Sequence, residues 1–304
     1  MHIIKYLKAI SDETRLRLLF LLLHYELNVN EVVAVVEMIQ SRVSRHLKIL
    51  TESGLLQFRR DGGFVYYSAL TDEANGPVVR LVADALADDP VCEADLGRAE
   101  ALIRERKSRT KRFFESVADT WEVRKHDVLG DLDLNRILAD RVGNCPVAAD
   151  LGCGTGALLA ALNGQVPTVI GVDSSPGMLE QARLKTAAMA GVNLRLGELE
   201  YLPMRDREAH CAVMNMVLHH ISEPVKVLAE AYRILHPGGT FFIADFDKHN
   251  KVAVREKIGG SWFGFSQNEM DAWLAGAGFV PAGLERFAVN YGLTVNLFVS
   301  KKQQ

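Results

Sequence analysis

The chain of 304 residues is long enough to fold as two domains with separate hydrophobic cores. A charged fraction of 24% and a net charge of −3 at pH 7 exclude binding to nucleic acid through overall basicity, so such a role requires a local basic patch. We find no secretory signal and no apolar run near the roughly 20 residues that span a bilayer, which predicts a cytoplasmic protein without a membrane segment.

The first 70 residues have the pattern of a helix-turn-helix. Amphipathic helices are expected over 14–24, near 30–36 and over 40–53, and Gly54 is placed to end the third of them. The turn between the second and third helices is short, which is typical of a recognition helix entering the major groove of DNA. We expect DNA to contact the exposed residues of this third helix: Ser41, Arg42, Ser44, Arg45 and His46.

Two strand-like runs follow, over 55–60 and 64–70, and Asp61-Gly62-Gly63 between them is a hairpin signal. Arg59 and Arg60 lie near the tip, so the hairpin is interpreted as a DNA-binding wing. Five Lys or Arg residues and one Glu occur between positions 41 and 60, although the first 90 residues are slightly acidic overall. This local stripe favours groove binding, and the alternative is an ordinary solvated helix face.

The segments SDETRLRLLFLL, QSRVSRHLKILTESGLL and RRDGGFVYY resemble the ArsR-type winged-helix repressors across nearly the whole of residues 1–90. The resemblance implies an α+β winged helix-turn-helix domain, a homodimer built on terminal helices, and a palindromic double-stranded operator. Metal-sensing members have cysteines where this chain has Asn28 and Asn30. Neutral amides do not supply the soft anionic ligands that such metals require, so we expect no metal site here.

The four cysteines form no C-x-x-C pair, and none has a histidine nearby at zinc-site spacing. Cys153 lies within a glycine-rich turn and Cys211 begins an apolar run, so both are expected to be buried thiols. Arsenic methylation is disfavoured because no cysteine cluster is present to hold the metalloid.

Residues 91–121 are expected to form a connector. A short helix over 78–87 precedes it, and Asp88-Asp89-Pro90 breaks the chain before a helical pattern from Glu93 to about Trp121. Its many cations either contact DNA phosphates or belong to a solvated connector that helps to pair two subunits. Its apolar end either covers a ligand pocket or simply packs on the second domain: Phe113, Phe114, Val117 and Trp121.

Residues 147–173 have the pattern of a strand, a glycine turn, a helix and a second strand. Glycines at alternate positions let the backbone approach a ligand and direct N–H groups toward it. A carboxylate at the tip of the second strand, Asp173, is placed to accept hydrogen bonds from ribose hydroxyls. The pattern therefore predicts an adenosine-type ligand, but the turn alone also fits a nicotinamide dinucleotide or a purely structural role.

From residue 122 to residue 304, strands and helices alternate as in an α/β Rossmann-like domain. The segments DLGCGTG, VIGVDSSPGMLEQA, LGELEYLP, VLHH and ILHPGGTFFIADF resemble, in order and spacing, the class I S-adenosylmethionine-dependent methyltransferases. This resemblance displaces the nicotinamide alternative. It implies binding of S-adenosylmethionine or S-adenosylhomocysteine by these residues: Asp150, Gly152, Gly154, Gly156, Asp173, Ser174, Met178, Glu198, Leu199, Asn215 and Met216. Glu198 stands where the family usually has Asp, which weakens the inference of an adenine contact there.

Two functions remain. The chain is either a repressor whose methyltransferase-like domain senses an adenosyl ligand, or an active methyltransferase on a small molecule that uses the winged helix for autoregulation. His219 and His220 are the acid/base candidates beside the pocket, although paired histidines there commonly serve packing, and methyl transfer needs little beyond positioning. We favour the sensor, because the fusion resembles S-adenosylhomocysteine-responsive repressors. The sequence does not identify the catalytic residues, the acceptor, the physiological nucleoside, the sign of its effect, the operator or the regulated genes.

Overall fold

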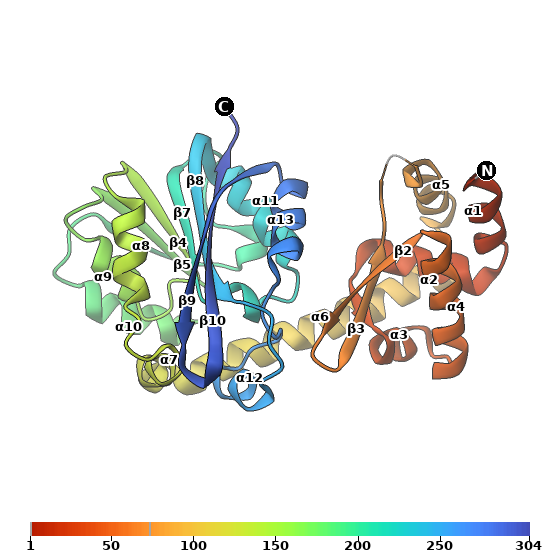
Figure 1. The fold of residues 1–304 in the computed structure, drawn as a ribbon, viewed down its shortest axis with the longest axis horizontal. Helices are drawn as coiled ribbons and strands as arrows, with labels where there is room; N and C mark the ends of the chain where they lie inside the picture. The colour runs from red at the N-terminus through yellow and green to blue at the C-terminus, as the bar shows by residue number, and fades with distance from the viewer. Residues whose placement is uncertain (1, 73) are drawn as a thin grey trace. The chain divides into compact units, whose positions relative to one another are not determined.

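The computed structural model describes residues 2–72 and 74–304, which divide into two compact units within a 28-residue helix, α6 (Pro90–Val117), between Arg106 and Lys107 (Figure 1). Each unit is treated by itself. Across the described residues, none of the helices combines the length and apolar character needed to cross a bilayer. The division into residues 1–90, 91–121 and 122–304 stays a prediction.

The N-terminal unit is a winged helix. Its sheet has three antiparallel strands in the order β1-β3-β2, and the last two form the expected hairpin. Besides the first part of α6, its elements are α1 (His2–Ile10), α2 (Glu13–His24), β1 (Leu27–Asn28), α3 (Val29–Val36), α4 (Gln40–Ser53), β2 (Leu56–Asp61), β3 (Phe64–Ala69) and α5 (Gly76–Leu86).

Local signals set several boundaries in this unit. Asp12 caps α2 by accepting a hydrogen bond from the Arg15 N–H, and Gly54 ends α4 in the left-handed conformation with φ 88°. The predicted apolar underside of α4 is confirmed, because Val43, Leu47 and Leu50 are all fully buried in the core of the unit. Helix α1 was not predicted.

The C-terminal unit is an α/β domain around a seven-stranded sheet in the order β6-β5-β4-β7-β8-β10-β9. The first five strands are parallel, and β10 pairs antiparallel with both β8 and β9. Besides the last part of α6, its helices and turns are η1 (Ala118–Thr120), α7 (Trp121–Leu129), α8 (Leu134–Val142), α9 (Ala157–Leu162), α10 (Pro176–Thr186), η2 (Leu199–Tyr201), η3 (Leu218–His220), α11 (Pro224–Ile234), α12 (Val252–Ile258), α13 (Gln267–Gly276) and η4 (Asn290–Gly292). Its strands are β4 (Val147–Leu151), β5 (Thr168–Asp173), β6 (Val192–Leu196), β7 (Ala209–Asn215), β8 (Leu235–Phe246), β9 (Phe279–Val289) and β10 (Leu293–Lys302).

The strand order reverses direction at β4. The chain adds β5 and β6 on one side of β4 and then returns to add β7 and β8 on the other. Helices α8, α9 and α10 lie on one face of the sheet, and α11 and α13 lie on the other (Figure 1). In open α/β sheets, ligands bind outside the carboxyl ends of the strands at such a switch point, so the topology directs attention to the ends of β4 and β7.

One expectation about elements in this part of the chain was wrong. The expected helix from Glu93 to Trp121 is interrupted, because α6 ends at Val117 and the turn η1 precedes α7. Strand β8 begins at Leu235, where Leu235 pairs with Ala209 before an irregularity in the β7–β8 ladder.

Candidate functional site

The glycine turn after β4 has the backbone that the sequence predicted. Gly152, Gly154 and Gly156 all have positive φ, of 81°, 51° and 78°. A Cβ added to Gly152 would lie 2.7 Å from the side chain of Val217, and one added to Gly156 would lie 3.1 Å from Ala182. Both the conformation and the close packing therefore require glycine in this turn.

Asp173, at the tip of β5, holds the glycine turn in place. Its two carboxylate oxygens accept hydrogen bonds from the backbone N–H groups of Gly154, at 2.8 Å, and Ser175, at 2.9 Å. Burial raises the pKa of Asp173, these N–H groups partly offset the shift, and the Glu198 carboxylate adds to it. The side chain is thus oriented before any ligand arrives.

Asp150, near the end of β4, is buried without a partner. Its side chain is 1% exposed, and neither oxygen has a hydrogen-bond partner within residues 2–72 and 74–304. Burial raises the pKa of Asp150 to about 7, while the positive charge of Lys125 acts in the opposite direction. Burial likewise lowers the pKa of Lys125. A hydrogen-bond donor or a cation bound beside Asp150 would give its carboxylate oxygens the partner that they lack. The amino group of an adenosyl amino acid is such a donor.

A small pocket lies among α7, the ends of β7 and β8, and α12. It adjoins the glycine turn, because a Cβ on Gly154 would lie 4.0 Å from the indole nitrogen of Trp121, which also lines the pocket. Met216, just after β7, lines it with a positive φ of 60°. The lining residues are Trp121, Lys125, Val128, Leu129, Met216, His219, Phe246 and Ile258.

The other ligand-binding residues expected from sequence have varied surroundings. Met178 and Leu199 are buried, Ser174 is half-buried and Glu198 is exposed. Asn215 donates a hydrogen bond to the Asn135 side chain at 2.8 Å, which leaves its own carbonyl oxygen buried without a partner among the described residues. Asp173 thus lies close to Gly154 and Glu198. The ligand contacts of the whole set stay a prediction.

Sequence reasoning did not single out two side chains that the structure brings to this region. Lys125 faces the charge of Asp150, and no pattern in the sequence marks it. Asp245, near the end of β8, accepts from the backbone N–H of His219 and lies 2.8 Å from its ring Nδ1. An apolar strand ending in aspartate was the same signal that identified Asp173, so it would have found Asp245 as well.

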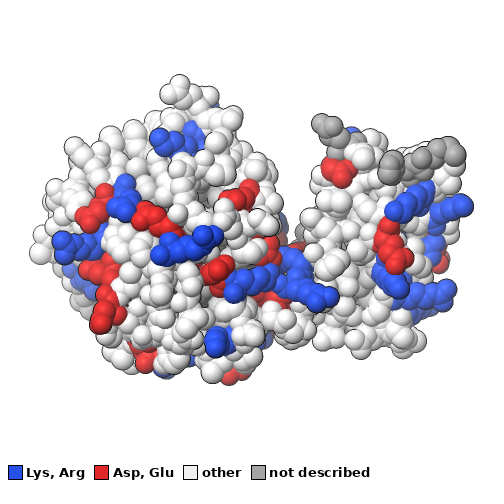
Figure 2. All heavy atoms as spheres, in the orientation of Figure 1, with Lys and Arg blue, Asp and Glu red and all other residues white. Residues whose placement is uncertain are grey.

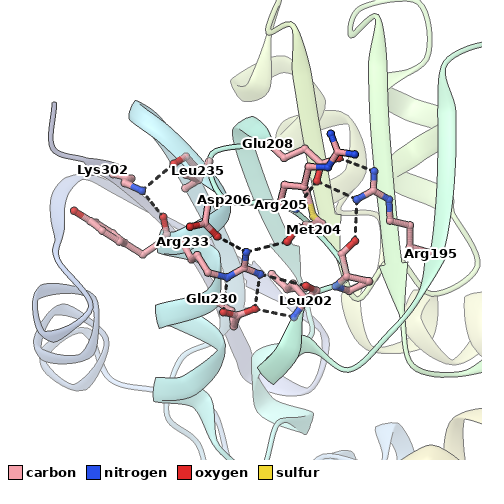
Figure 3. Close-up of polar contacts among 12 residues, drawn as sticks. Arg195, Leu202, Met204, Arg205, Asp206, Glu208, Glu230, Arg233, Leu235 and Lys302 are labelled. Carbon is pink, nitrogen blue, oxygen red and sulfur yellow. Dashed lines mark hydrogen bonds and ion pairs between the residues drawn. The ribbon is translucent and has the colours of Figure 1, made fainter.

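A second hollow in this unit is held together by internally paired charges (Figure 3). Arg195 donates to Glu208 at 2.6 Å and to the Pro203 carbonyl at 2.8 Å. Arg233 is bound in the same way by Glu230, with contacts of 2.7 Å. Because these guanidinium groups already have carboxylate partners, they join β6 and α11 to the loop before β7 rather than offering free charge to a ligand.

In the N-terminal unit, four of the expected DNA-binding residues of α4 are exposed: Ser41, Arg42, Ser44 and Arg45. The Arg42 guanidinium donates to the Thr14 hydroxyl at 3.3 Å, and within the described residues no carboxylate pairs with Arg42 or Arg45. Figure 2 shows Lys and Arg side chains gathered over the α2 and α4 side of this unit. Arg60, on the wing, is exposed too.

The expectation that His46 is exposed was wrong. The side chain is 8% exposed and lies 3.8 Å from Asp12, and burial lowers its pKa. The interpretation of Arg59 as a free wing cation was wrong as well. Its guanidinium binds both oxygens of Glu26, at 2.7 and 2.9 Å, and lies over the ring of Tyr66. These two residues maintain the fold rather than face outward.

Asn28, at the position where metal-sensing ArsR-type proteins have cysteine, caps α3. Its side-chain oxygen accepts from the N–H groups of Asn30 and Glu31, and Glu31 bonds back to the Asn28 N–H in a capping box. The four cysteines are free and buried. Among the described residues, no group of three or more His, Cys, Asp or Glu side chains is placed to hold a metal ion.

Comparison with known proteins supports this description of the two units. The model for bacterial regulatory proteins of the arsR family matches residues 12–57, and the model for a methyltransferase domain matches residues 149–243. The C-terminal unit therefore has the class I methyltransferase fold. The whole chain joins an arsR-family helix-turn-helix domain to a class I methyltransferase domain.

Two relatives and one solved structure are informative. An uncharacterized 37.1 kDa protein in a transposon of Streptomyces fradiae is 36% identical over 60% of this chain and 55% of that protein. An arsenite methyltransferase of Halobacterium salinarum is 39% identical over 32% of this chain and 26% of that protein. A complex of the Haloferax volcanii Trm112 methyltransferase activator with a methyltransferase matches with a TM-score of 0.54 and 20% identity, over 64% of this chain and 98% of that one. The chain thus spans about half or less of these curated relatives, and the structural match concerns the fold alone.

Proposed function

We propose that the protein is a cytoplasmic DNA-binding repressor whose methyltransferase domain binds S-adenosylhomocysteine or S-adenosylmethionine as an effector. The observation that carries this proposal is the presence in one chain of two kinds of unpaired polar group. Arg42 and Arg45 extend from α4 without carboxylate partners among the described residues, and Asp150 is buried without a hydrogen-bond partner there. A polyanion complements the two arginines, and a ligand with an amino group complements Asp150.

The position of α4 supports DNA as a partner. Residues of the first turns of a recognition helix contact base edges in the major groove, and Ser41, Arg42, Ser44 and Arg45 are in those turns. Helices α1 and α5 leave large apolar side chains exposed, notably Ile3 at 52%, Leu7 at 50% and Leu81 at 62%. Exposed apolar side chains of this kind support a homodimer, and a dimer with twofold symmetry binds a palindromic operator.

The two carboxylates support an adenosyl ligand. Asp173 is oriented by backbone N–H groups at the tip of β5, where ribose hydroxyls are bound in folds of this type. Asp150 would receive the ligand's ammonium group, which relieves the cost of a buried unpaired carboxylate. Both nucleosides carry this ammonium and ribose, so the carboxylates fit either one.

Helix α6 offers a route between ligand and DNA. Its first part buries Ala99 and Ile103 in the core of the N-terminal unit. Within the C-terminal unit, Phe114 packs edge-on against Trp121 and His220, with ring centroids 5.1 and 4.7 Å away. A ligand that displaces Trp121 would move the end of α6, and the same helix contributes residues to the core of the N-terminal unit.

Calorimetry with each nucleoside, together with operator-shift assays on the full-length protein, tests the proposal. We expect S-adenosylhomocysteine to weaken operator binding by about 5- to 150-fold, with a smaller effect from S-adenosylmethionine. Accumulation of a toxic product is the useful signal for relieving repression. By reciprocity, operator DNA must weaken nucleoside binding by the same factor. Operator affinity that neither nucleoside changes would overturn the sensor.

A second candidate function is methyl transfer to a small molecule. One observation favours it, namely the buried imidazole of His219 held by the Asp245 carboxylate beside the glycine turn. Fold alone does not decide between the two functions, because one fold supports many activities. A single chain accommodates both, since the product of methyl transfer from S-adenosylmethionine is S-adenosylhomocysteine.

A further inference from the structure

His219 is held in one orientation at the edge of the pocket. It lies in the short turn η3 after β7, where its backbone N–H donates to Asp245 Oδ2 at 3.1 Å. Its ring Nδ1 lies 2.8 Å from Asp245 Oδ1. The side chains are 2% and 0% exposed, so water does not compete for this pair. Two contacts to one carboxylate fix both the backbone and the ring.

The other ring nitrogen of His219, Nε2, is buried and lacks a hydrogen-bond partner among the described residues. A carboxylate at Nδ1 keeps the proton on that nitrogen, so Nε2 presents a lone pair. Nε2 is buried and has no hydrogen-bond partner in the described part of the chain, while the residue lines the pocket with Leu129, Met216 and Phe246. A buried acceptor without a donor is costly, and its position in the wall of a pocket indicates that a ligand provides the donor.

His219 lies apart from the residues that are predicted to bind the nucleoside. Asp150 and Asp173 lie on β4 and β5, whereas His219 and Asp245 lie at the ends of β7 and β8, on the other side of β4. Trp121 is shared by the two regions, because it lies beside Gly154 and also lines the pocket. A ligand on β4 and β5 would therefore have the pocket of His219 as its neighbour.

We propose that His219 is the general base for methyl transfer from S-adenosylmethionine to a small neutral acceptor with a weakly acidic hydroxyl group, such as a phenol, and that Asp245 is its positioning residue. The proposal rests on the adenosyl site of the proposed function and adds catalysis to it. The acceptor oxygen forms a bond to the methyl carbon as the carbon–sulfur bond breaks. The electron pair stays on sulfur and gives S-adenosylhomocysteine, while the hydroxyl proton passes to Nε2. The imidazolium remains paired with Asp245 until it releases the proton to water.

The pocket lining indicates why the acceptor is neutral and needs a base. Trp121, Val128, Leu129, Phe246 and Ile258 form mostly apolar walls, and burial lowers the pKa of Lys125 in the same lining, so an anionic acceptor would be buried at a high cost. A hydroxyl group enters protonated and becomes a good nucleophile only as its proton leaves.

Among the described residues, the other titratable groups near His219 are not paired with a buried carboxylate in the way that His219 is paired with Asp245. The rings of His219 and His220 are 3.9 Å apart, and burial lowers the pKa of His220 well below its usual value. Burial also lowers the pKa of His249 to about 4, with His219 acting in the same direction. Lys125 lines the pocket, and its pKa is lowered by burial but raised by Glu122 and Asp150. Near neutral pH, His220 and His249 are therefore uncharged, and His219 has the carboxylate that stabilises its protonated form.

The test uses the full-length protein, S-adenosylmethionine labelled in the methyl group, and phenol and 4-nitrophenol as acceptor probes, with anisole as the probe that lacks a hydroxyl group. We expect label in the phenols and none in anisole. His219→Gln should lower kcat by about 100- to 10,000-fold while S-adenosylhomocysteine affinity stays within about twofold of wild type. His236→Gln is the matched control, because His236 stacks on His210 at the amino ends of β7 and β8.

Asp245→Asn provides an independent test. Loss of the carboxylate removes the charge that is paired with the imidazolium, so the acidic limb of the kcat profile should move to lower pH as the rate falls. If His219→Gln loses S-adenosylhomocysteine binding through misfolding, this shift decides the matter, and an unchanged profile overturns the proposal. Transfer at the wild-type rate by a folded His219→Gln protein overturns it, and so does the absence of label in both phenols. Wild-type protein that binds S-adenosylhomocysteine but transfers no label refutes this inference alone, whereas failure to bind refutes the adenosyl site itself.

Discussion

The two units differ in the surroundings of their unmatched charges. In the N-terminal unit, Arg42 and Arg45 extend from α4 into solvent, where an unpaired cation costs little free energy. In the C-terminal unit, Asp150 is buried, and the protein bears a cost that shows as a raised pKa. DNA bound by α4 would therefore add an interaction to an unstrained surface. A nucleoside bound at Asp150 would instead relieve a cost already present in the free protein, so it should also stabilise the fold.

The largest expected effect concerns the free-energy cost of burying the ionised carboxylate of Asp150. Its carboxyl group has a pKa of about 7 in the folded chain, against 3.8 as the reference for the unfolded chain. The stabilising effect of the protonated form is fully present below pH 3.8 and is lost as pH rises through 7. Relative to Asp150→Asn, the wild-type protein should lose about 3 kcal/mol of unfolding free energy between pH 4 and pH 7. Denaturant unfolding across this range measures the difference.

Asp131→Asn is the matched control for that experiment, because Asp131 is an exposed carboxylate in the same unit. It should follow the wild-type pH dependence. Parallel curves for wild type and Asp150→Asn would mean that the carboxylate is solvated or paired, and the contrast between the units would disappear. In the wild type, S-adenosylhomocysteine affinity should rise from pH 6 to pH 8 as Asp150 ionises.

A second prediction separates Asp173 from Asp150. Asp173 already accepts two backbone hydrogen bonds, so Asp173→Ala removes both a ribose acceptor and the anchor of Gly154. We expect nucleoside affinity to fall by roughly 10- to 100-fold, which corresponds to about 1.5–3 kcal/mol for hydrogen bonds to a charged group. Calorimetry measures the change, with the exposed Asp206→Ala as control. Unchanged affinity would place the ligand elsewhere.

A third and smaller effect contrasts exposed with paired cations in the N-terminal unit. Arg42→Ala and Arg45→Ala should weaken operator binding, and each should reduce the slope of log affinity against log salt by about 1 if it removes a phosphate contact. Arg59→Ala should leave the slope unchanged, because Glu26 already neutralises Arg59. Its effect should be a loss of stability of the wing. Equal slopes for the three variants would show that carboxylate pairing does not decide which arginines contact DNA.

The smallest effect is expected from metals. Asn28 and Asn30 supply amides, and Asn28 already caps α3. Arsenite, zinc and cadmium should therefore leave operator affinity unchanged. Tight stoichiometric binding of any of them that changes operator affinity would contradict the inference that sensing has moved to the C-terminal unit.

Sequence patterns predicted the features that depend on neighbours along the chain. Helix α4 and its Gly54 cap were placed to the residue, because a glycine in the left-handed conformation is a local signal. The glycine turn and the strand-end position of Asp173 followed from the same kind of pattern. Sequence did not reveal the pairing of Arg59 with Glu26 or the burial of Asp150 without a partner, because these depend on residues that meet only in the folded chain.

The error at His46 was avoidable. Val43, His46, Leu47 and Leu50 are spaced at i, i+3, i+4 and i+7, which is one apolar stripe of a helix. His46 was assigned to the exposed face because of its polarity, although its spacing places it with the core residues. The burial of His46 shows that helical periodicity was the better guide here.

The capping box of α3 has a consequence for the introduction of a metal site at this position. Asn28 holds two backbone N–H groups, and its partner Glu31 forms an ion pair with Arg106 of α6. A cysteine at position 28 would remove the cap, at a cost of about 1 kcal/mol, before a complete metal site existed to compensate. A metal site built here one residue at a time would thus begin with a loss of stability.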